Sequence, residues 1–373
     1  MQVERDIAAI TVPFAVGLTA SIFFCPVTGH HLHLIPVTSV SISLTAALLL
    51  LWSRTQTWNP AILTATIAVI FVSAGIMTGS SGHMLSISGT EDAGWWHEKA
   101  SAFGNAMSSA IDRIPFDNPA SNGIIKALIT GERCGIPTEV AEAFRESGAA
   151  HILALSGLHL GIIYGLLKFV LSFAGNTPAA RIMKSLTVIL CCGFYTSVTG
   201  CGPSITRAFL FILIGESAAM TGRKAGLAGI LMTSFLIQTV MNPTSIREAG
   251  FQLSYAAVAG IAFIYPHLKK LWPDGERKEA MLPASMRWIW NSASMSISCQ
   301  LTTGPLAYVY FGTLPEYFIL TNLIALPLTG ILIPAALVTL AACEAGVCPM
   351  ILIKATEALV SGLTEALRII AAP

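Results

Sequence analysis

The chain has 373 residues, of which 54% are hydrophobic and only 11% are charged, and its mean hydropathy is +0.70. A soluble domain carries about 25% charged residues, so this composition excludes one and predicts an integral membrane protein. The net charge of +1 excludes a broad basic surface for nucleic acid. Any contact with an anion must therefore come from a few individually placed side chains.

Three apolar runs within residues 1–78 predict the first transmembrane helices. They cover Ile7–Cys25, Ile35–Trp52 and Ala61–Met77, and each is close to the length of about 20 residues that a bilayer crossing needs. The segment Gly29–His33 holds three histidines without an acidic partner, so we expect a loop there. No metal site and no cofactor is predicted in the chain.

Residues 79–149 form the one long hydrophilic stretch, with acidic and basic side chains throughout. Two amphipathic helices are expected in it: Ser121–Thr130, ended by Gly131, and Thr138–Ser147, ended by Gly148. We interpret this stretch as an extracytoplasmic, partly amphipathic helical segment.

Seven further apolar runs raise the predicted number of spans to about ten, as in a polytopic all-α helical bundle. Residues 150–341 form the main membrane domain. Residues 342–373 form a C-terminal amphipathic segment, in which four charges interrupt Ile351–Ile370. The seven runs are Ala150–Phe173, Met183–Val198, Ile205–Met220, Ala225–Met241, Phe251–Tyr265, Trp288–Phe311 and Tyr317–Leu340.

Basic residues set the predicted orientation. With a cytoplasmic N-terminus, most lysines and arginines fall in cytoplasmic loops, and the short outer loops hold only Arg207 and Arg247. The positive-inside rule therefore predicts a cytoplasmic N-terminus and an outer location for residues 79–149. The eight cysteines form no CxxC pair and are interpreted as small residues in apolar segments.

The first run of the main domain carries polar residues that lipid would not tolerate. On one continuous helix, His151 and His159 lie on the same face, with Ser156 beside His159. The opposite face carries glycines at four-residue spacing, which predicts close helix packing: Gly157, Gly161 and Gly165.

Two breaking residues, Gly202 and Pro203, precede a helix whose first turn contains Arg207. An arginine in that position needs a carboxylate, phosphate or carbonyl partner. Two interpretations stay open: the side chain reaches to the membrane interface, or it lines a path for an anion.

Three later runs also combine polar side chains with helix breakers, and the second repeats serine along a helical stripe. Such a pattern predicts broken or re-entrant helices around a cavity or conduit. No acidic ladder for a proton-coupled pump is found. The residues concerned are Gly250, Gln252 and Ser254 in the first, Ser296, Gln300 and Pro305 in the second, and Asn322 and Pro327 in the third.

The sequence His-Ile-Leu-Ala-Leu-Ser-Gly-Leu-His of residues 151–159 resembles the HLLAISGLH motif of the ComEC-type competence protein family. The resemblance covers about residues 120 to 340. Further blocks are similar to the family's in order and spacing: Ala127–Arg133, Phe144–Gly148, Gly202–Ala208, Asn242–Pro243, Gly250–Ala256, Thr303–Pro305, and Asn322 with Pro327.

The resemblance implies a multi-pass channel in the bacterial inner membrane that passes single-stranded DNA into the cytoplasm during natural transformation. Its expected partners are single-stranded DNA and membrane lipid. A DNA receptor protein, a cytoplasmic helicase, a separate nuclease and a homodimer are further partners that it leaves open. Full-length members usually add an oligonucleotide-binding fold and a C-terminal nuclease. The HxHxDH run of that nuclease does not occur here, so no enzymatic activity is expected.

Within this interpretation, cations meet phosphates and polar side chains meet bases. Arg247 is a further candidate for the uptake side, and the basic residues of 269–278 belong either to the cytoplasmic exit or to an ordinary positive-inside loop. Residues expected to line the channel or contact DNA are Arg145, His151, Ser156, His159, Arg207, Gln252, Ser254, Ser296, Gln300 and Asn322. Residues expected to pack or break helices are Gly157, Gly161, Gly165, Gly202, Pro203, Gly250, Pro305 and Pro327.

Two other functions compete with the channel. One is an intramembrane hydrolase with Ser156 as nucleophile and His159 as base, although no orienting acid is evident. The other is a small-solute transporter, although no internal duplication is evident. A structural role for Ser156 and His159, as a hydrogen-bonded knot, is compatible with the channel.

Overall fold

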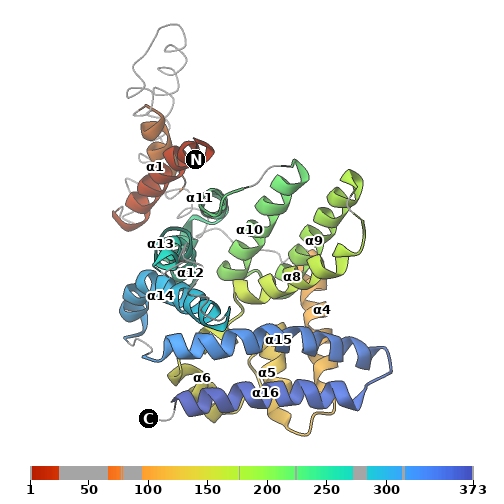
Figure 1. Cartoon of the computed structure of the whole chain (residues 1–373). Coiled ribbons are helices and arrows are strands. Elements are labelled where there is room, and N and C mark those ends of the chain that lie inside the picture. The colour runs from red at the N-terminus through yellow and green to blue at the C-terminus, as the bar shows by residue number, and fades with distance from the viewer. Residues whose placement is uncertain are drawn as a thin grey trace, which may run out of the picture. The chain divides into compact units, whose positions relative to one another are not determined.

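The structure, a computed structural model, describes residues 2–24, 66–76, 78, 95–175, 177–222, 225–271, 284–312 and 316–371. All regular structure in these ranges is helical (Figure 1), which confirms the all-α prediction. The predicted span Ile35–Trp52 and the histidines of Gly29–His33 lie outside the described residues. The chain divides into two compact units, and each is described by itself.

The first unit contains residues 1–92 and 224–255. In it, α1 (Gln2–Phe24) packs against α11 (Leu227–Met241) and η1 (Pro243–Arg247). Glycine allows α1 and the helix Thr66–Ile76 to touch through their backbones, because a Cβ atom on Gly17 would overlap the Val72 carbonyl group. This is the close approach that small residues permit between membrane helices.

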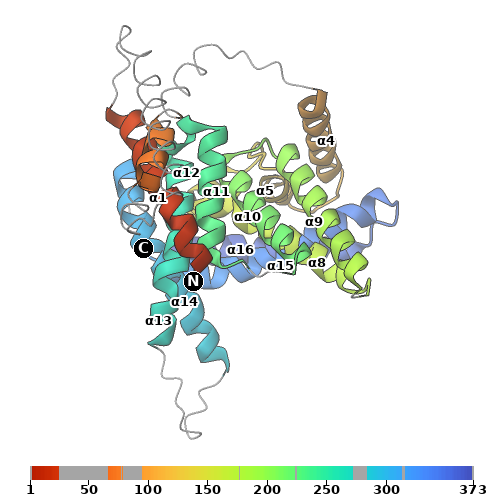
Figure 2. The same ribbon diagram turned by 90° about the horizontal axis from the view of Figure 1, so that it is seen from above.

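The second unit contains residues 93–223 and 256–373. One part of it is a bundle of three helices, α8 (Gly157–Ser172), α9 (Pro178–Val198) and α10 (Pro203–Met220), which lie side by side (Figure 2). Leu160, Val188 and Ile205 form the apolar centre of this bundle. Many side chains on its outer surface are apolar and exposed, as in helices that face lipid.

Another part of the second unit joins the hydrophilic segment to the C-terminal helices. It contains α4 (Trp95–Asp112), α5 (Pro119–Ile129), α6 (Thr138–Glu146), α15 (Phe318–Glu344) and α16 (Met350–Ala371). Both predicted amphipathic helices are confirmed, and each ends before a glycine with positive φ, at Gly131 and Gly148. Their apolar faces form one core with α15 and α16.

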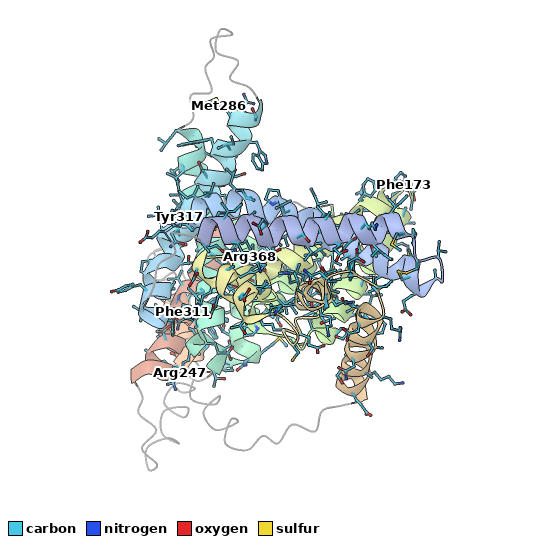
Figure 3. All side chains as sticks on the ribbon, turned by 90° about the horizontal axis from the view of Figure 1, so that it is seen from below. Phe173, Arg247, Met286, Phe311, Tyr317 and Arg368 are labelled. Carbon is cyan, nitrogen blue, oxygen red and sulfur yellow. A yellow bond between two sulfur atoms is a disulfide. The ribbon has the colours of Figure 1, made fainter. Side chains whose placement is uncertain are left out.

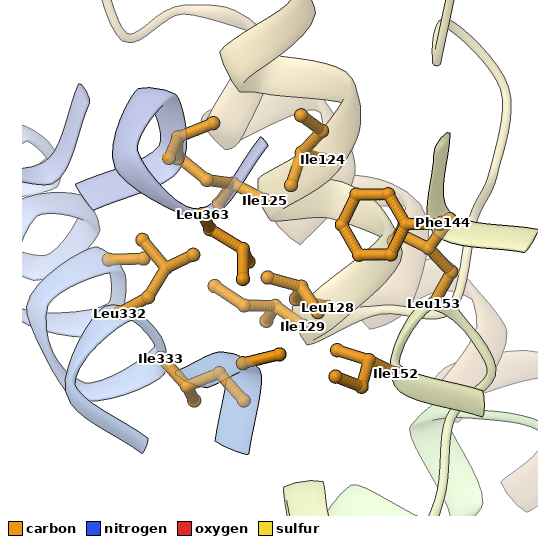
Figure 4. Packing of buried hydrophobic residues seen from close by; sticks show 14 of the residues in the cluster. Ile124, Ile125, Leu128, Ile129, Phe144, Ile152, Leu153, Leu332, Ile333 and Leu363 are labelled. Carbon is orange, nitrogen blue, oxygen red and sulfur yellow. The ribbon is translucent and has the colours of Figure 1, made fainter. Parts of the chain in front are cut away.

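This core explains the amphipathic pattern of α16. Ile353, Val360, Leu363 and Leu367 are buried on one face, and the cluster around them includes Ile124, Leu128, Phe144 and Leu332 (Figure 4). Arg368, which is labelled in Figure 3, has its Nη2 atom 3.9 Å from Glu139 Oε2 of α6. Burying each large apolar side chain contributes about 1.5–3 kcal/mol, so α16 is an integral part of this core.

A disulfide between Cys343 and Cys348 closes the turn from α15 to α16. The interpretation of these two cysteines as small core residues was therefore wrong. Their pairing depends on how the chain turns between the helices, which spacing alone does not reveal. Beside the turn, Arg113 Nη2 lies 2.6 Å from Glu344 Oε1.

Two predicted helix breaks were also wrong. Helix α14 (Ala284–Phe311) continues through Pro305, and α15 continues through Pro327. A proline removes one backbone hydrogen bond, but neighbouring helices and hydroxyl side chains let a membrane helix tolerate it. Before Pro305, for example, Thr302 and Thr303 donate to the Cys299 carbonyl at 2.9 and 2.8 Å.

A departure from α-helical geometry occurs elsewhere, between α12 (Ala249–Ala259) and α13 (Tyr265–Lys270). The intervening residues Gly260–Ile264 form a π-helix that packs against α14. A Cβ atom on Gly260 would overlap the Ser298 carbonyl oxygen of α14 and lie 2.7 Å from Thr302 Oγ1. Only glycine fits at this crossing.

Four of the described helices are long and apolar enough to cross a membrane, and four shorter helices are also apolar. They support the interpretation of a membrane protein, whereas the number of about ten spans stays a prediction. The long helices are Pro178–Val198, Pro203–Met220, Ala249–Lys270 and Phe318–Glu344, and the short ones are Ile7–Ser21, Thr66–Ile76, Gly157–Ser172 and Leu227–Met241.

The π-helix crossing yields a first prediction. Gly260→Ala should destabilise the protein by about 1–3 kcal/mol, because the new methyl group meets backbone that cannot move aside. Gly330→Ala is the matched control, since a Cβ atom there meets nothing within 4 Å and alanine favours a helix. Thermal unfolding in detergent should show a lower Tm for Gly260→Ala alone. Equal Tm values for the two variants would contradict the tight crossing.

Candidate functional site

The sequence analysis predicted one continuous helix through residues 151–159. In the structure, the motif does not form one helix, so this prediction was wrong. Helix α7 (Ala150–Leu153) ends, residues 154–156 are not helical, and α8 starts at Gly157. Ser156 is the N-cap of α8, with φ −131° and ψ 173°. Its hydroxyl accepts a hydrogen bond from the Leu158 N–H at 3.3 Å. Serine favours this capping position over a helix interior, which is why the chain breaks here.

His159 completes the cap. The Ser156 N–H donates to His159 Nδ1 at 3.2 Å, so the two residues satisfy each other's backbone in a capping box. Because Nδ1 accepts this bond, the neutral imidazole carries its proton on Nε2. His159 is fully buried. The hydrogen-bonded knot is thus what the geometry shows.

The same geometry bears on the hydrolase alternative. Ser156 Oγ lies 3.2 Å from His159 Nδ1, which is within reach for a nucleophile and a base. The other ring nitrogen, Nε2, is buried and has no hydrogen-bond partner among the described residues. No carboxylate in that part of the chain therefore orients the imidazole as a third member would.

His151 does not share a face with His159. It is exposed on α7, and its Nδ1 lies 3.0 Å from the Gly148 carbonyl oxygen, to which it donates. The predicted stacking of the two histidines was wrong because the break at residues 154–156 changes the direction of the chain between them.

Arg207 lies against the first residue of α8. The chain breaks before α10, as predicted; Gly202 is the N-cap of this helix, and Pro203 is its first residue, where a missing N–H costs nothing. Arg207 is only 7% exposed, and its guanidinium carbon lies 5.9 Å from the centre of the Phe211 ring. A Cβ atom on Gly157 would lie 3.4 Å from Arg207 Nη2 and 3.3 Å from Ala208 Cβ.

The predicted glycine stripe therefore packs closely at one position. A Cβ atom on Gly161 or Gly165 would meet nothing within 4 Å among the described residues. Gly157 is the glycine that lets α10 approach α8, and it does so at the N-terminus of α8, where the helix dipole is positive.

A second group of polar residues lies between α14 and α15. Ser294, Ser296 and Ser298 are buried on α14, and Asn322 Nδ2 of α15 donates to Ser296 Oγ at 3.3 Å. Ser294 Oγ and Asn322 Oδ1 are buried without a hydrogen-bond partner in the described part of the chain. Gln300 is half-buried on the same helix. Ser294 Oγ and Asn322 Oδ1 thus have hydrogen-bonding capacity that no group in the described part of the chain uses.

Helix α15 connects this polar group to the motif. Thr321 Oγ1 donates to the Ser147 carbonyl oxygen at 2.6 Å, at the end of α6, and α15 also packs against α8. The two polar groups thus belong to helices in direct contact within the second unit.

The remaining predicted residues lie elsewhere. Arg145 is exposed on α6. Gln252, whose Nε2 donates to the Ile246 carbonyl oxygen at 2.8 Å, belongs to the first unit. So do Ser254, which is buried on α12, and the exposed residues Arg247 and Gly250. Of the four basic residues proposed for the exit, Lys269 and Lys270 are exposed on α13, and Arg277 and Lys278 lie outside the described residues.

The sequence analysis missed one charged site. Glu216 of α10 is almost fully buried and accepts three hydrogen bonds, from Tyr164 Oη at 2.7 Å, Lys168 Nζ at 2.9 Å and Ser185 Oγ at 2.7 Å. The sequence signal that could have revealed this site is the presence of one acidic residue, Glu216, in the apolar run Ile205–Met220. No cluster of histidine, cysteine and acidic residues suited to a metal occurs in the described ranges.

Comparison with known proteins identifies relatives. A profile of the family described as "Competence protein" matches residues 128–373. The chain is 34% identical over 138 residues to ComE operon protein 3 of Bacillus subtilis, which covers 37% of this chain and 17% of that protein. It is 26% identical over 222 residues to competence protein ComA of Neisseria gonorrhoeae, which covers 58% of this chain and 30% of that one.

A further relative is the uncharacterized protein YcaI of Escherichia coli, 27% identical over 221 residues, or 58% of this chain and 28% of that protein. The matched region thus spans less than a third of each of these three relatives. No solved structure gives a significant match.

The contact between α8 and α10 yields a second prediction. Cysteines at positions 157 and 208 should form a disulfide, since the two Cβ atoms would lie close to the separation that a disulfide needs. The test uses Gly157→Cys with Ala208→Cys in a protein that retains only Cys343 and Cys348. A protease site between α8 and α9 lets a non-reducing gel report the cross-link. Gly161→Cys with Ala208→Cys is the control pair and should stay reduced; equal cross-linking of both pairs would contradict the geometry.

Proposed function

The chain belongs to the Competence protein family, and from this we propose that it forms an inner-membrane channel that passes single-stranded DNA into the cytoplasm during natural transformation. Because the matched region covers only part of each relative, no activity of a whole relative is transferred to it. The proposal concerns a path for the strand and assigns no catalysis to this chain.

The observation that carries the proposal is the position of Arg207. Its buried guanidinium lies beside the positive N-terminal end of α8. Two positive groups in a water-poor site favour an anion near them. A phosphodiester suits a guanidinium because the planar fork donates two parallel hydrogen bonds to phosphate oxygens.

The polar group of α14 and α15 supports the same proposal. Ser294 and Asn322 carry hydrogen-bonding atoms without a partner among the described residues, and such atoms suit a substrate that carries donors and acceptors through the membrane. Single-stranded nucleic acid does so, because its phosphates and base edges are both available for contact.

Several finer statements belong to the proposal. The N-terminus is cytoplasmic, residues 79–149 are extracytoplasmic, and Arg145 and Arg247 attract DNA on the outer side. A DNA receptor, a cytoplasmic helicase and a separate nuclease supply delivery, pulling and strand degradation, and two copies of the chain can associate. A small-solute transporter is the main alternative function for a polar path of this kind.

The hydrolase remains a second candidate because Ser156 Oγ lies 3.2 Å from His159 Nδ1. A nucleophile and a helix cap respond differently to substitution. Ser156→Asn removes the nucleophile but keeps a good N-cap and adds no charge beside Arg207, so it should preserve function in a channel and abolish it in a hydrolase.

Transformation of the source cell by linear DNA tests the function. Deletion of the gene should abolish transformation, and wild-type chain should restore it. Arg207→Ala should restore at most about one tenth of the wild-type frequency at equal membrane abundance, a loss equivalent to about 1.4 kcal/mol. Arg207→Lys should be intermediate because it keeps the charge and loses the fork.

Arg181→Ala is the matched control, since Arg181 is exposed at the far end of the same three-helix bundle. It should transform like wild type. Normal transformation of the deletion strain would overturn the DNA channel and favour the transporter. Normal transformation by Arg207→Ala would leave the channel standing without its chosen residue.

The disulfide tests the orientation. Disulfides persist on the oxidising side of a membrane, so the turn with Cys343 and Cys348 should be extracytoplasmic, as should Arg113, which contacts Glu344 beside it. With a cytoplasmic N-terminus, this location requires an odd number of spans before the turn and therefore differs from the ten that the sequence predicts. In a variant that retains only these two cysteines, a maleimide reagent applied to denatured protein from cells should modify neither thiol before reduction and both after it. Modification without reductant would place the turn on the cytoplasmic side.

A further inference from the structure

We propose that Glu216 is a positioning residue: held by Tyr164, Lys168 and Ser185, it fixes the register of α8 against α10 and so keeps Arg207 at the first turn of α8. The functional consequence rests on the proposed role of Arg207. The register itself does not, and it is measured separately below.

The cluster connects all three helices of the bundle, which lie side by side in Figure 2. Glu216 Oε1 on α10 accepts hydrogen bonds from Tyr164 Oη and Lys168 Nζ on α8, and Oε2 accepts one from Ser185 Oγ on α9. Both carboxylate oxygens are used. Bonds to an ionised acceptor are short and directional, so they specify where each helix must lie.

The geometry couples this cluster to the site at Arg207. Helix α8 touches α10 at two levels: Gly157 meets Arg207 and Ala208, and Tyr164 with Lys168 meets Glu216. Nine residues separate Arg207 from Glu216, which is about 14 Å along a helix. The two helices run in the same direction, so sliding α8 by one turn, about 5.4 Å, would move both contacts together.

Among the described residues of this interface, the other contacts specify the register less strongly. The apolar contacts of Leu160, Val188 and Ile205 are non-directional, and Gly161 and Gly165 make no close contact with α10. A buried ion pair is seldom retained for stability alone, since apolar residues of similar volume serve equally well. Specifying one register is the role that this cluster suits.

Lys168 makes the buried carboxylate tolerable. Its side chain is 43% exposed, whereas that of Glu216 is 3% exposed, so the ammonium group reaches from solvent or the interface to the buried acid. A neutral replacement at position 216 keeps the shape but removes the attraction that draws Lys168 inward. Loss of register is therefore the expected result of neutralising Glu216.

The test uses the two cysteine pairs described above. With Glu216→Gln, cross-linking of Gly157→Cys with Ala208→Cys should fall at least threefold, and Gly161→Cys with Ala208→Cys, silent in the parent, should begin to cross-link. One turn separates positions 157 and 161, so the second pair reports a register shift directly. In a protein without the engineered cysteine pairs, Glu216→Gln should transform at about a tenth of the wild-type frequency.

Leu160→Ala is the control for simple destabilisation, because Leu160 is fully buried in the same bundle and forms no directional bond there. It should lower the Tm and leave the cross-linking pattern unchanged. If Glu216→Gln does not accumulate in the membrane, Ser185→Ala and Tyr164→Phe carry the test, each with a smaller shift in the same direction.

An unchanged cross-linking pattern in the Glu216, Ser185 and Tyr164 variants would overturn the positioning role, whatever happens to transformation. So would the same pattern change in Leu160→Ala. A register shift in Glu216→Gln, combined with normal transformation by Arg207→Ala, would leave the positioning role intact and refute the role of Arg207 in DNA uptake. The two proposals thus fail separately.

Discussion

The hydrogen bond from the Ser156 N–H to His159 Nδ1 is the interaction on which the rest of the site depends. It completes the capping box at Ser156, so that α8 starts as a separate helix at Gly157. Because α8 starts at Gly157, both this glycine and the positive end of the helix dipole face Arg207. If the chain continued as one helix through residues 154–156, the N–H groups of α8 would all be used internally.

Much of the fold follows from local pattern. The glycines after α5 and α6 and the Gly202-Pro203 start of α10 act over a few residues, and each lies where the sequence predicts. The failures occur where local preference meets its surroundings. Hydrophobic periodicity predicted one helix across Ser156 because it ignores capping. The prolines at 305 and 327 predicted helix breaks, but packed helices tolerate proline and continue through both positions.

The site divides in the same way. Arg207 was chosen as a candidate from the sequence because a charge beside a helix start in an apolar run is a local observation, and its role in uptake stays a prediction. Glu216 was missed because its partners lie 31 to 52 positions away, and only the packing of three helices brings them together. The disulfide of Cys343 was missed for a related reason: its partner is five positions away, but only the path of the turn decides whether the two sulfur atoms meet. Sequence thus indicates where charge is costly, and tertiary structure shows what balances it.

That balance differs at the two ends of α10. At Glu216, the charge of the carboxylate is matched by Lys168 at 2.9 Å, so this end of the helix pair is close to neutral. Such a neutral pair cannot act as a counter-ion for Arg207, nine residues away on the same helix. Moving Glu216 next to Arg207 would cancel the positive potential at the start of α8 and remove its attraction for an anion. Keeping the acid distant and paired allows α10 to be held in place at Glu216 while Arg207 stays at the first turn of α8.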